Sequence, residues 1–140
     1  MKAFTTTLFS IFMISLFVSC NAQNPDNAKS ETVSGNDIEI YYFHFTKRCL
    51  TCNAVESETK LALATNYEEE MAEGVIAFSS LNLDEEEGKK IAEDLKVSGQ
   101  TLLLVKGDKH VNLTNDGFMN ARANPEKFHA ILKEQLDKLL

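Results

Sequence analysis

Short apolar segments alternate with amphipathic ones throughout residues 38–140, and this alternation limits the fold more than any other feature of the chain. Apolar runs of strand length lie at residues 38–45, 75–83, 101–106 and 110–113. Apolar residues recur at helical spacing over residues 52–73, 85–95 and 125–139. The sequence therefore predicts the order β-α-β-α-β-β-α in a single α/β domain.

The order of these segments also predicts the strand directions. Two strands that are joined by a helical crossover must be parallel, whereas the short Gly107-Asp108 turn predicts an antiparallel hairpin. The run at residues 101–106 is almost continuously apolar, which is typical of a strand that is buried on both faces. We therefore expect a four-stranded mixed sheet flanked by helices.

Polar residues mark the expected helix ends. Gly74 is placed to end the first helix, and Asp84 is placed to cap the second. Asn124 is predicted to cap the last helix, with Pro125 at its first position. The stretch between the hairpin and Asn124 is interpreted as a loop that carries the solvated charge of Arg122.

Charge and cysteine content exclude several classes of function. Lys and Arg number 14 against 21 Asp and Glu, a net charge of −7, and such a surface repels the phosphate backbone of nucleic acids. Three cysteines are too few for a disulfide-stapled scaffold or a four-thiolate zinc site. We expect no nucleic-acid partner, no metal site and no cofactor.

The N-terminal segment resembles an export signal. Lys2 precedes an apolar run at residues 8–18, and Ser19-Cys20 is similar to a bacterial lipobox, which implies lipid attachment at Cys20. An ordinary signal-peptidase cut after Ala22 is the alternative, and both interpretations predict export to the periplasmic side of a bacterial membrane. Residues 1–20 are thus the predicted signal, residues 21–37 a polar tether and residues 38–140 the folded domain.

The motif Cys49-Leu50-Thr51-Cys52 lies between the first predicted strand and the first predicted helix. Unpaired N–H groups and the helix dipole favour a thiolate at that place, and Lys47 and Arg48 add positive charge there. The second cysteine lies about one turn further into the helix, close enough for a disulfide. An outer nucleophile with an inner resolving thiol is the minimum apparatus for thiol–disulfide exchange.

These features resemble the thioredoxin superfamily. The resemblance implies a minimal thioredoxin-like fold, with an active disulfide at Cys49 and Cys52 and a substrate loop at Gly99-Gln100-Thr101. Gln100 stands where that family usually has a cis-proline, and Arg48 replaces its usual tryptophan. Phe43 replaces the buried acid of thioredoxin itself. Thr51 and His44, which lie beside the motif, are further candidates for tuning the thiolate.

A narrower resemblance joins three further runs, Tyr41-Tyr42-Phe43-His44, residues 48–56 and residues 113–119. They are similar to short exported proteins named as subunits of nitrophenyl-compound nitroreductases. This resemblance implies that electrons pass through the cysteine pair to an exported or membrane redox partner. We separately expect a monomer whose own membrane contact is limited to the lipid anchor. The alternatives are a carrier of soft metal or arsenite and an inert disulfide-bearing binding domain.

The lipobox interpretation makes a testable prediction. Replacing Cys20 by Ala should abolish metabolic labelling by a palmitate analogue, because the acceptor thiol is lost, while export continues. Labelling of the parent chain serves as the control. Persistent labelling of the Cys20→Ala variant, or a mature N-terminus at Gln23, would contradict the anchor and favour simple cleavage.

Overall fold

A computed structural model describes residues 38–140 of the chain, so the predicted signal, the tether and Cys20 lie outside the described residues. The described elements are listed here in chain order: β1 (Ile38–His44), α1 (Leu50–Asn66), α2 (Glu68–Ala72), β2 (Ile76–Asn82), α3 (Glu86–Asp94), β3 (Thr101–Lys106), β4 (Lys109–Asn112), α4 (Thr114–Asn120) and α5 (Pro125–Asp137).

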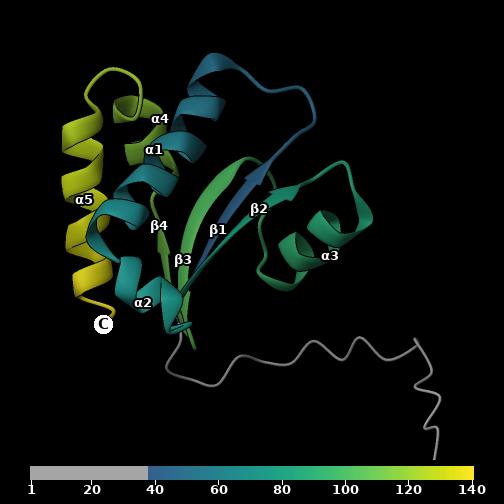
Figure 1. Ribbon diagram of the computed structural model, residues 1–140. Coiled ribbons are helices and arrows are strands. Elements are labelled where there is room, and N and C mark those ends of the chain that lie inside the picture. The colour runs from purple at the N-terminus through teal and green to yellow at the C-terminus, as the bar shows by residue number, and fades with distance from the viewer. Residues whose placement is uncertain (1–37) are drawn as a thin grey trace, which may run out of the picture. The chain divides into compact units, whose positions relative to one another are not determined.

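The four strands form one mixed sheet in the order β2-β1-β3-β4. β1 is parallel to β2, whereas β3 is antiparallel to both β1 and β4. Helices α1, α4 and α5 lie on one face of the sheet and α3 lies on the other (Figure 1). This arrangement confirms the predicted four-stranded mixed sheet flanked by helices and its predicted strand directions.

The main core lies between the sheet and the helices α1 and α5. Alternate residues of β1 and β3 face it, as the side-chain period of two requires. Its fully buried side chains include Ile38, Ile40, Tyr42, Val55, Leu63, Leu102, Leu104, Phe128, Leu132 and Leu136. Burial of each large aliphatic or aromatic side chain stabilises the fold by about 1.5–3 kcal/mol.

The structure differs from the sequence prediction in three elements. The first predicted helix is interrupted at Tyr67, whose φ of −140° and ψ of 32° separate α1 from α2. The stretch expected to be a loop before Arg122 contains the short helix α4. The residue that caps α3 is Glu85, because the Asp84 carboxylate accepts a hydrogen bond from the Thr46 backbone instead. The predicted Asn124 cap and Pro125 start are confirmed.

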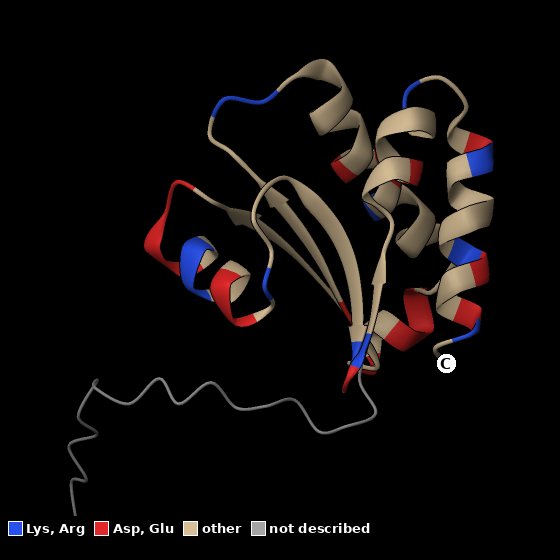
Figure 2. Cartoon of the chain, turned by 180° about the vertical axis from the view of Figure 1, so that it is seen from behind, with Lys and Arg blue, Asp and Glu red and all other residues tan. Residues whose placement is uncertain are grey.

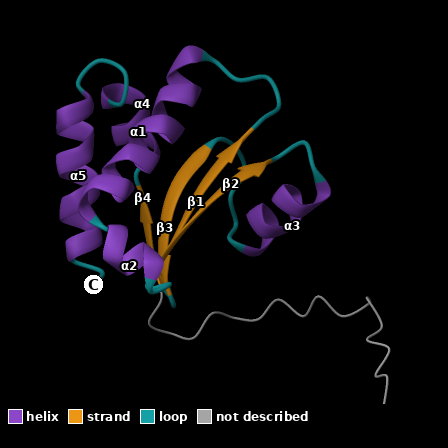
Figure 3. Cartoon of the chain, in the orientation of Figure 1, coloured by secondary structure: helices purple, strands orange, loops and turns teal. Residues whose placement is uncertain are grey.

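The strand register brings three loops to one end of the sheet. His44 pairs with Asn82, and Phe43 pairs with Thr101, so β1 and β2 end where β3 begins. The loops that follow β1 and β2 therefore meet the loop that precedes β3 (Figure 3). The Cys49-Cys52 motif and the Gly99-Gln100-Thr101 loop consequently lie at the same end of the domain.

Helix α3 packs on the sheet through Gly88. A Cβ atom at this position would lie 2.0 Å from the backbone oxygen of Asn82, whereas one at Gly99 would have no neighbour within 4 Å. Gly88→Ala should therefore lower the free energy of unfolding by about 1–3 kcal/mol in urea denaturation, because the helix must shift. Gly99→Ala is the control and should leave it almost unchanged. Equal stabilities would contradict this packing.

Candidate functional site

Cys49 and Cys52 form a disulfide at the junction of β1 and α1, with their Cα atoms 5.0 Å apart. Cys49 is the N-cap of α1, and its sulfur accepts a hydrogen bond of 3.1 Å from the backbone N–H of Cys52. Cys49 is exposed, whereas only 2% of Cys52 is exposed. The two sulfurs are therefore inequivalent, because Cys49 is exposed at the N-terminus of α1 whereas Cys52 is buried.

Hydrogen bonds hold the loop between β1 and α1. The backbone N–H of Thr46 donates to the Asp84 carboxylate at 2.8 Å, and the Asn82 amide donates to the Thr46 hydroxyl at 3.0 Å. The Thr46 backbone hydrogen bond keeps the pKa of Asp84 below its ordinary value. The loop that carries the first cysteine is thus anchored to the end of β2.

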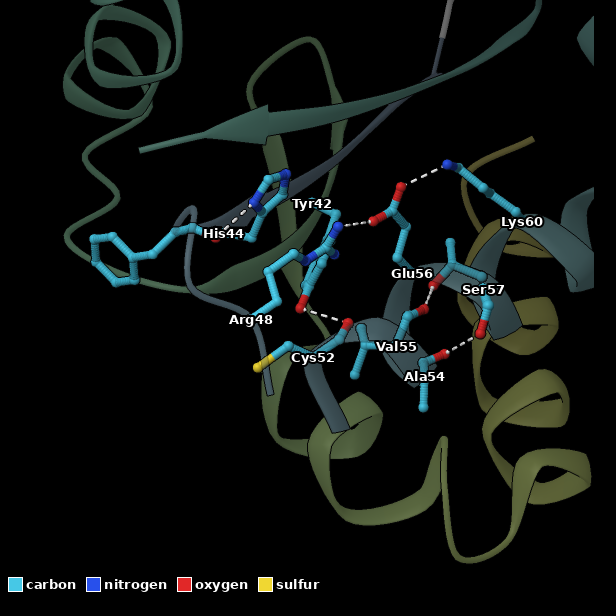
Figure 4. A network of polar contacts seen from close by, with 11 residues as sticks. Tyr42, His44, Arg48, Cys52, Ala54, Val55, Glu56, Ser57 and Lys60 are labelled. Atoms are coloured by element: carbon cyan, nitrogen blue, oxygen red, sulfur yellow. Dashed lines mark hydrogen bonds and ion pairs between the residues drawn. The ribbon is translucent and has the colours of Figure 1, made fainter. Parts of the chain in front are cut away.

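Next to Cys52, a chain of polar contacts joins β1 to α1 (Figure 4). The buried Tyr42 hydroxyl donates to the backbone oxygen of Cys52 at 2.9 Å. The guanidinium carbon of Arg48 lies 5.4 Å from the centre of the Tyr42 ring, and its Nη1 forms an ion pair with Glu56. Lys60 forms a second ion pair with Glu56 at 2.5 Å. The first two turns of α1 are therefore tied to the central strand.

Charge within this network is compensated locally. Burial alone would raise the pKa of Glu56, but hydrogen bonds from Lys60 and Arg48 outweigh it and lower that pKa. Burial raises the pKa of Tyr42 despite the opposing effect of Arg48. Nε and Nη2 of Arg48 are buried and have no hydrogen-bond partner among the described residues. Since Arg48 is paired with Glu56, much of the charge expected to act on the thiolate is neutralised.

The other residues expected beside the motif take separate positions. Lys47 is exposed in the loop before α1, and Figure 2 shows a basic stretch in this loop. Thr51 is partly buried in the first turn of α1. Nδ1 of His44 donates to the backbone oxygen of Phe45 at 3.0 Å. None of the described hydrogen bonds or ion pairs joins these three side chains to a cysteine.

The loop before β3 reaches the inner cysteine directly. Oε1 of Gln100 lies 3.6 Å from the Cys52 sulfur, a distance at which it could accept a hydrogen bond from the S–H of the reduced cysteine. The Thr101 hydroxyl donates to the backbone oxygen of Gly99 at 3.0 Å. No cis peptide bond occurs between residues 38 and 140. The Gln100–Cys52 contact brings two predicted site regions together, although no sequence pattern indicates which side chain would contact the sulfur.

Cys49 lies at the surface, and neither cysteine lines the neighbouring pocket. An open pocket of about 210 Å³ lies beside the loop before α1, and its lining residues are Phe45, Leu83, Lys89, Ala92, Glu93, Val97 and Ser98. Leu50, between the cysteines, is 71% exposed.

Within residues 38–140, no cluster of three or more Cys, His, Asp or Glu side chains could hold a metal ion. No helix of this range is long and apolar enough to cross a membrane.

Comparison with known proteins finds no matching family model and no matching curated protein. Among solved structures, the chain is similar to the germline-specific thioredoxin Deadhead of Drosophila melanogaster, with 17% identity, a TM-score of 0.47 and coverage of 75% of this chain and 83% of that one. It is also similar to a malarial protein, with 18% identity, a TM-score of 0.42 and coverage of 56% and 81%. A third similar structure is a thioredoxin from Thermus thermophilus, with 19% identity, a TM-score of 0.32 and coverage of 55% of this chain and 58% of that one.

The Arg48–Glu56 pair makes a prediction about stability. The lowered pKa of Glu56 means that its stabilising effect is complete above the unfolded-state value of about 4.3 and is lost as the pH falls through the folded value. Glu56→Gln should therefore reduce the free energy of unfolding by about 1–3 kcal/mol at pH 7, because half-buried Arg48 loses its partner.

The difference between the parent and Glu56→Gln should shrink towards zero in denaturant titrations as the pH falls through the lowered folded-state pKa of Glu56, because Glu56 of the parent then becomes protonated as well. Glu134→Gln is the matched control, since Glu134 forms an exposed pair with Lys138 on α5. It should change the stability by less than about 0.5 kcal/mol. A difference for Glu56→Gln that does not depend on pH would contradict the ion-pair explanation.

Proposed function

We propose that this protein exchanges dithiol for disulfide with a partner protein, with Cys49 as the attacking thiol and Cys52 as the resolving thiol. The observation that carries the proposal is the difference between the two sulfurs. Cys49 is exposed at the N-cap of α1, where helix N–H groups favour the thiolate, while Cys52 is buried one turn inside.

The exchange proceeds in two balanced steps. The Cys49 thiolate attacks one sulfur of a partner disulfide, forms a mixed disulfide and releases one partner thiolate. The Cys52 thiol then gives its proton to solvent, and its sulfur attacks Cys49 and releases the second partner thiolate. Two electrons pass to the partner, and Cys49 and Cys52 end as the disulfide; the reverse sequence oxidises a partner dithiol.

The position of the cysteines favours a protein as partner. The exposed sulfur lies beside the exposed side chain of Leu50, and neither cysteine lines the nearby pocket. A macromolecular surface can reach such a site without entering a cavity. We place the reaction outside the cytoplasm on the strength of the predicted export signal and Cys20 anchor, and delivery of electrons to a nitroreductase is the role that the narrower sequence resemblance suggests.

Trapping of the partner tests the assignment of roles. Cys52→Ser should accumulate a mixed disulfide between Cys49 and the partner, because the resolving sulfur is absent. The adduct should appear on non-reducing gels of cells that express the variant and should disappear with dithiothreitol. Cys49→Ser is the matched control and should trap nothing.

Two outcomes would contradict the proposal. Faster alkylation of Cys52 than of Cys49 at neutral pH in the reduced protein would reverse the roles. If neither variant captures a partner and the disulfide resists dithiol reductants, the pair is an inert structural bridge. Stoichiometric binding of arsenite or a soft metal by the reduced protein, without exchange, would favour the carrier alternative.

A further inference from the structure

Among the described residues, one polar side chain from outside α1 lies within hydrogen-bond reach of the Cys52 sulfur. Gln100 precedes β3, and its Oε1 lies 3.6 Å from the Cys52 sulfur. The backbone groups of Cys52 are engaged elsewhere: its N–H donates to the Cys49 sulfur and its oxygen accepts from Tyr42. The contact with Gln100 therefore involves only the sulfur of Cys52, so it depends on whether that sulfur is a thiol, a thiolate or part of a disulfide.

We propose that Gln100 is a positioning residue for the resolving step, with its amide as hydrogen-bond partner of the Cys52 sulfur in both the thiol and the thiolate states. This inference rests on the proposed exchange function. A glutamine amide carries an acceptor and two donors on a group that can turn end for end. Its oxygen accepts from the Cys52 S–H, and its nitrogen donates to the thiolate when the proton leaves.

The surroundings of Cys52 make such a partner valuable. Only 2% of the residue is exposed, and burial without a hydrogen bond disfavours a thiolate. Of the ionisable groups nearby, Tyr42 donates to the Cys52 backbone and Nη1 of Arg48 is bound by Glu56, and none of the described hydrogen bonds joins either side chain to the Cys52 sulfur. Phe43 supplies no charge. The Gln100 amide is thus the group at hand to solvate the charge that develops on the inner sulfur.

The same contact also favours one redox state. A disulfide sulfur has no proton to donate, so the hydrogen bond from the sulfur to Oε1 exists only in the dithiol form. The contact therefore stabilises the reduced protein relative to the oxidised one. Removal of the amide should shift the equilibrium with glutathione towards the Cys49–Cys52 disulfide by about 3- to 10-fold, the usual range for one hydrogen bond.

The resolving step can be followed with a small aromatic disulfide whose released thiolate is coloured, bis(carboxynitrophenyl) disulfide. The full chain is used with Cys20 replaced by Ala, so that Cys49 and Cys52 are its two thiols, and the reduced protein should release two coloured thiolates in sequence. The first marks attack by Cys49 on the reagent, and the second marks attack by Cys52 on the resulting mixed disulfide. Rapid mixing separates the two phases, so each cysteine is measured in the same experiment.

The test compares Gln100→Leu with Gln135→Leu, because Gln135 of α5 is the other glutamine among the described residues. Gln100→Leu should leave the first phase unchanged and slow the second about tenfold near neutral pH, with the second phase recovering as the pH is raised. Gln135→Leu should match the parent in both phases. A second phase in Gln100→Leu that equals the parent's would overturn the proposal.

A second variant keeps the test decisive if Gln100→Leu does not fold. Gln100→Glu retains an acceptor for the S–H but has no donor and repels the thiolate, so it should slow the second phase without moving the glutathione equilibrium towards the disulfide. A faster second phase in this variant would also overturn the proposal. Release of a single thiolate by the parent chain would instead contradict the exchange function itself, independently of Gln100.

Discussion

The hydrogen bond from Tyr42 to the backbone oxygen of Cys52 fixes the geometry on which the site depends. Tyr42 is fully buried in β1, the strand that pairs with both β2 and β3. Its hydroxyl therefore transmits the position of the central strand to the first turn of α1. Because β3 begins beside the end of β1, the same strand also sets where Gln100 stands. The Tyr42 hydroxyl thus ties α1 to the central strand, and the pairing of that strand with β3 places the Gln100 loop beside the same end of α1.

The chain is acidic, yet the N-terminus of α1 is kept free of negative side chains. The first turns of α2, α3 and α5 contain Glu68–Glu70, Glu86–Glu87 and Glu126, while the first turn of α1 contains no acidic residue. Elsewhere carboxylates complement the helix dipole, and here the Cys49 sulfur takes that place. Glu56 lies one turn further on, where it neutralises Arg48. The N-terminus of α1 therefore faces Cys49 without an opposing carboxylate in its first turn.

Hydrophobic periodicity and the turn and capping residues were enough to predict most of the fold. The strands, the helix start at Asn124–Pro125 and the Cys49–Cys52 junction each depend on residues that are neighbours in the sequence. The break at Tyr67 was not predictable in this way, since its hydroxyl is held by Asp137, which lies 70 residues away. Helix α4 has only seven residues and includes Gly117, which packs closely against Val55. Its stability comes from tertiary packing, which no window of sequence contains. The Arg48–Glu56 pairing and the Gln100–Cys52 contact likewise appear only when separate segments meet.

Phe43 and Gln100, which stand where the resemblance to thioredoxins predicts a buried acid and a cis-proline, both lie at the end of the domain that carries the cysteine pair. A buried acid at position 43 would have to be desolvated and would add its own titration beside the cysteines, whereas Phe43 is fully buried and stacks on Tyr41 with ring centres 5.8 Å apart. A proline at position 100 would have no polar side chain to offer the inner sulfur, whereas glutamine places an amide there. A neutral amide solvates a developing thiolate without introducing another charge. In the proposed exchange, two separate dipolar groups act on the two sulfurs: the N-terminus of α1 at Cys49 and the Gln100 amide at Cys52.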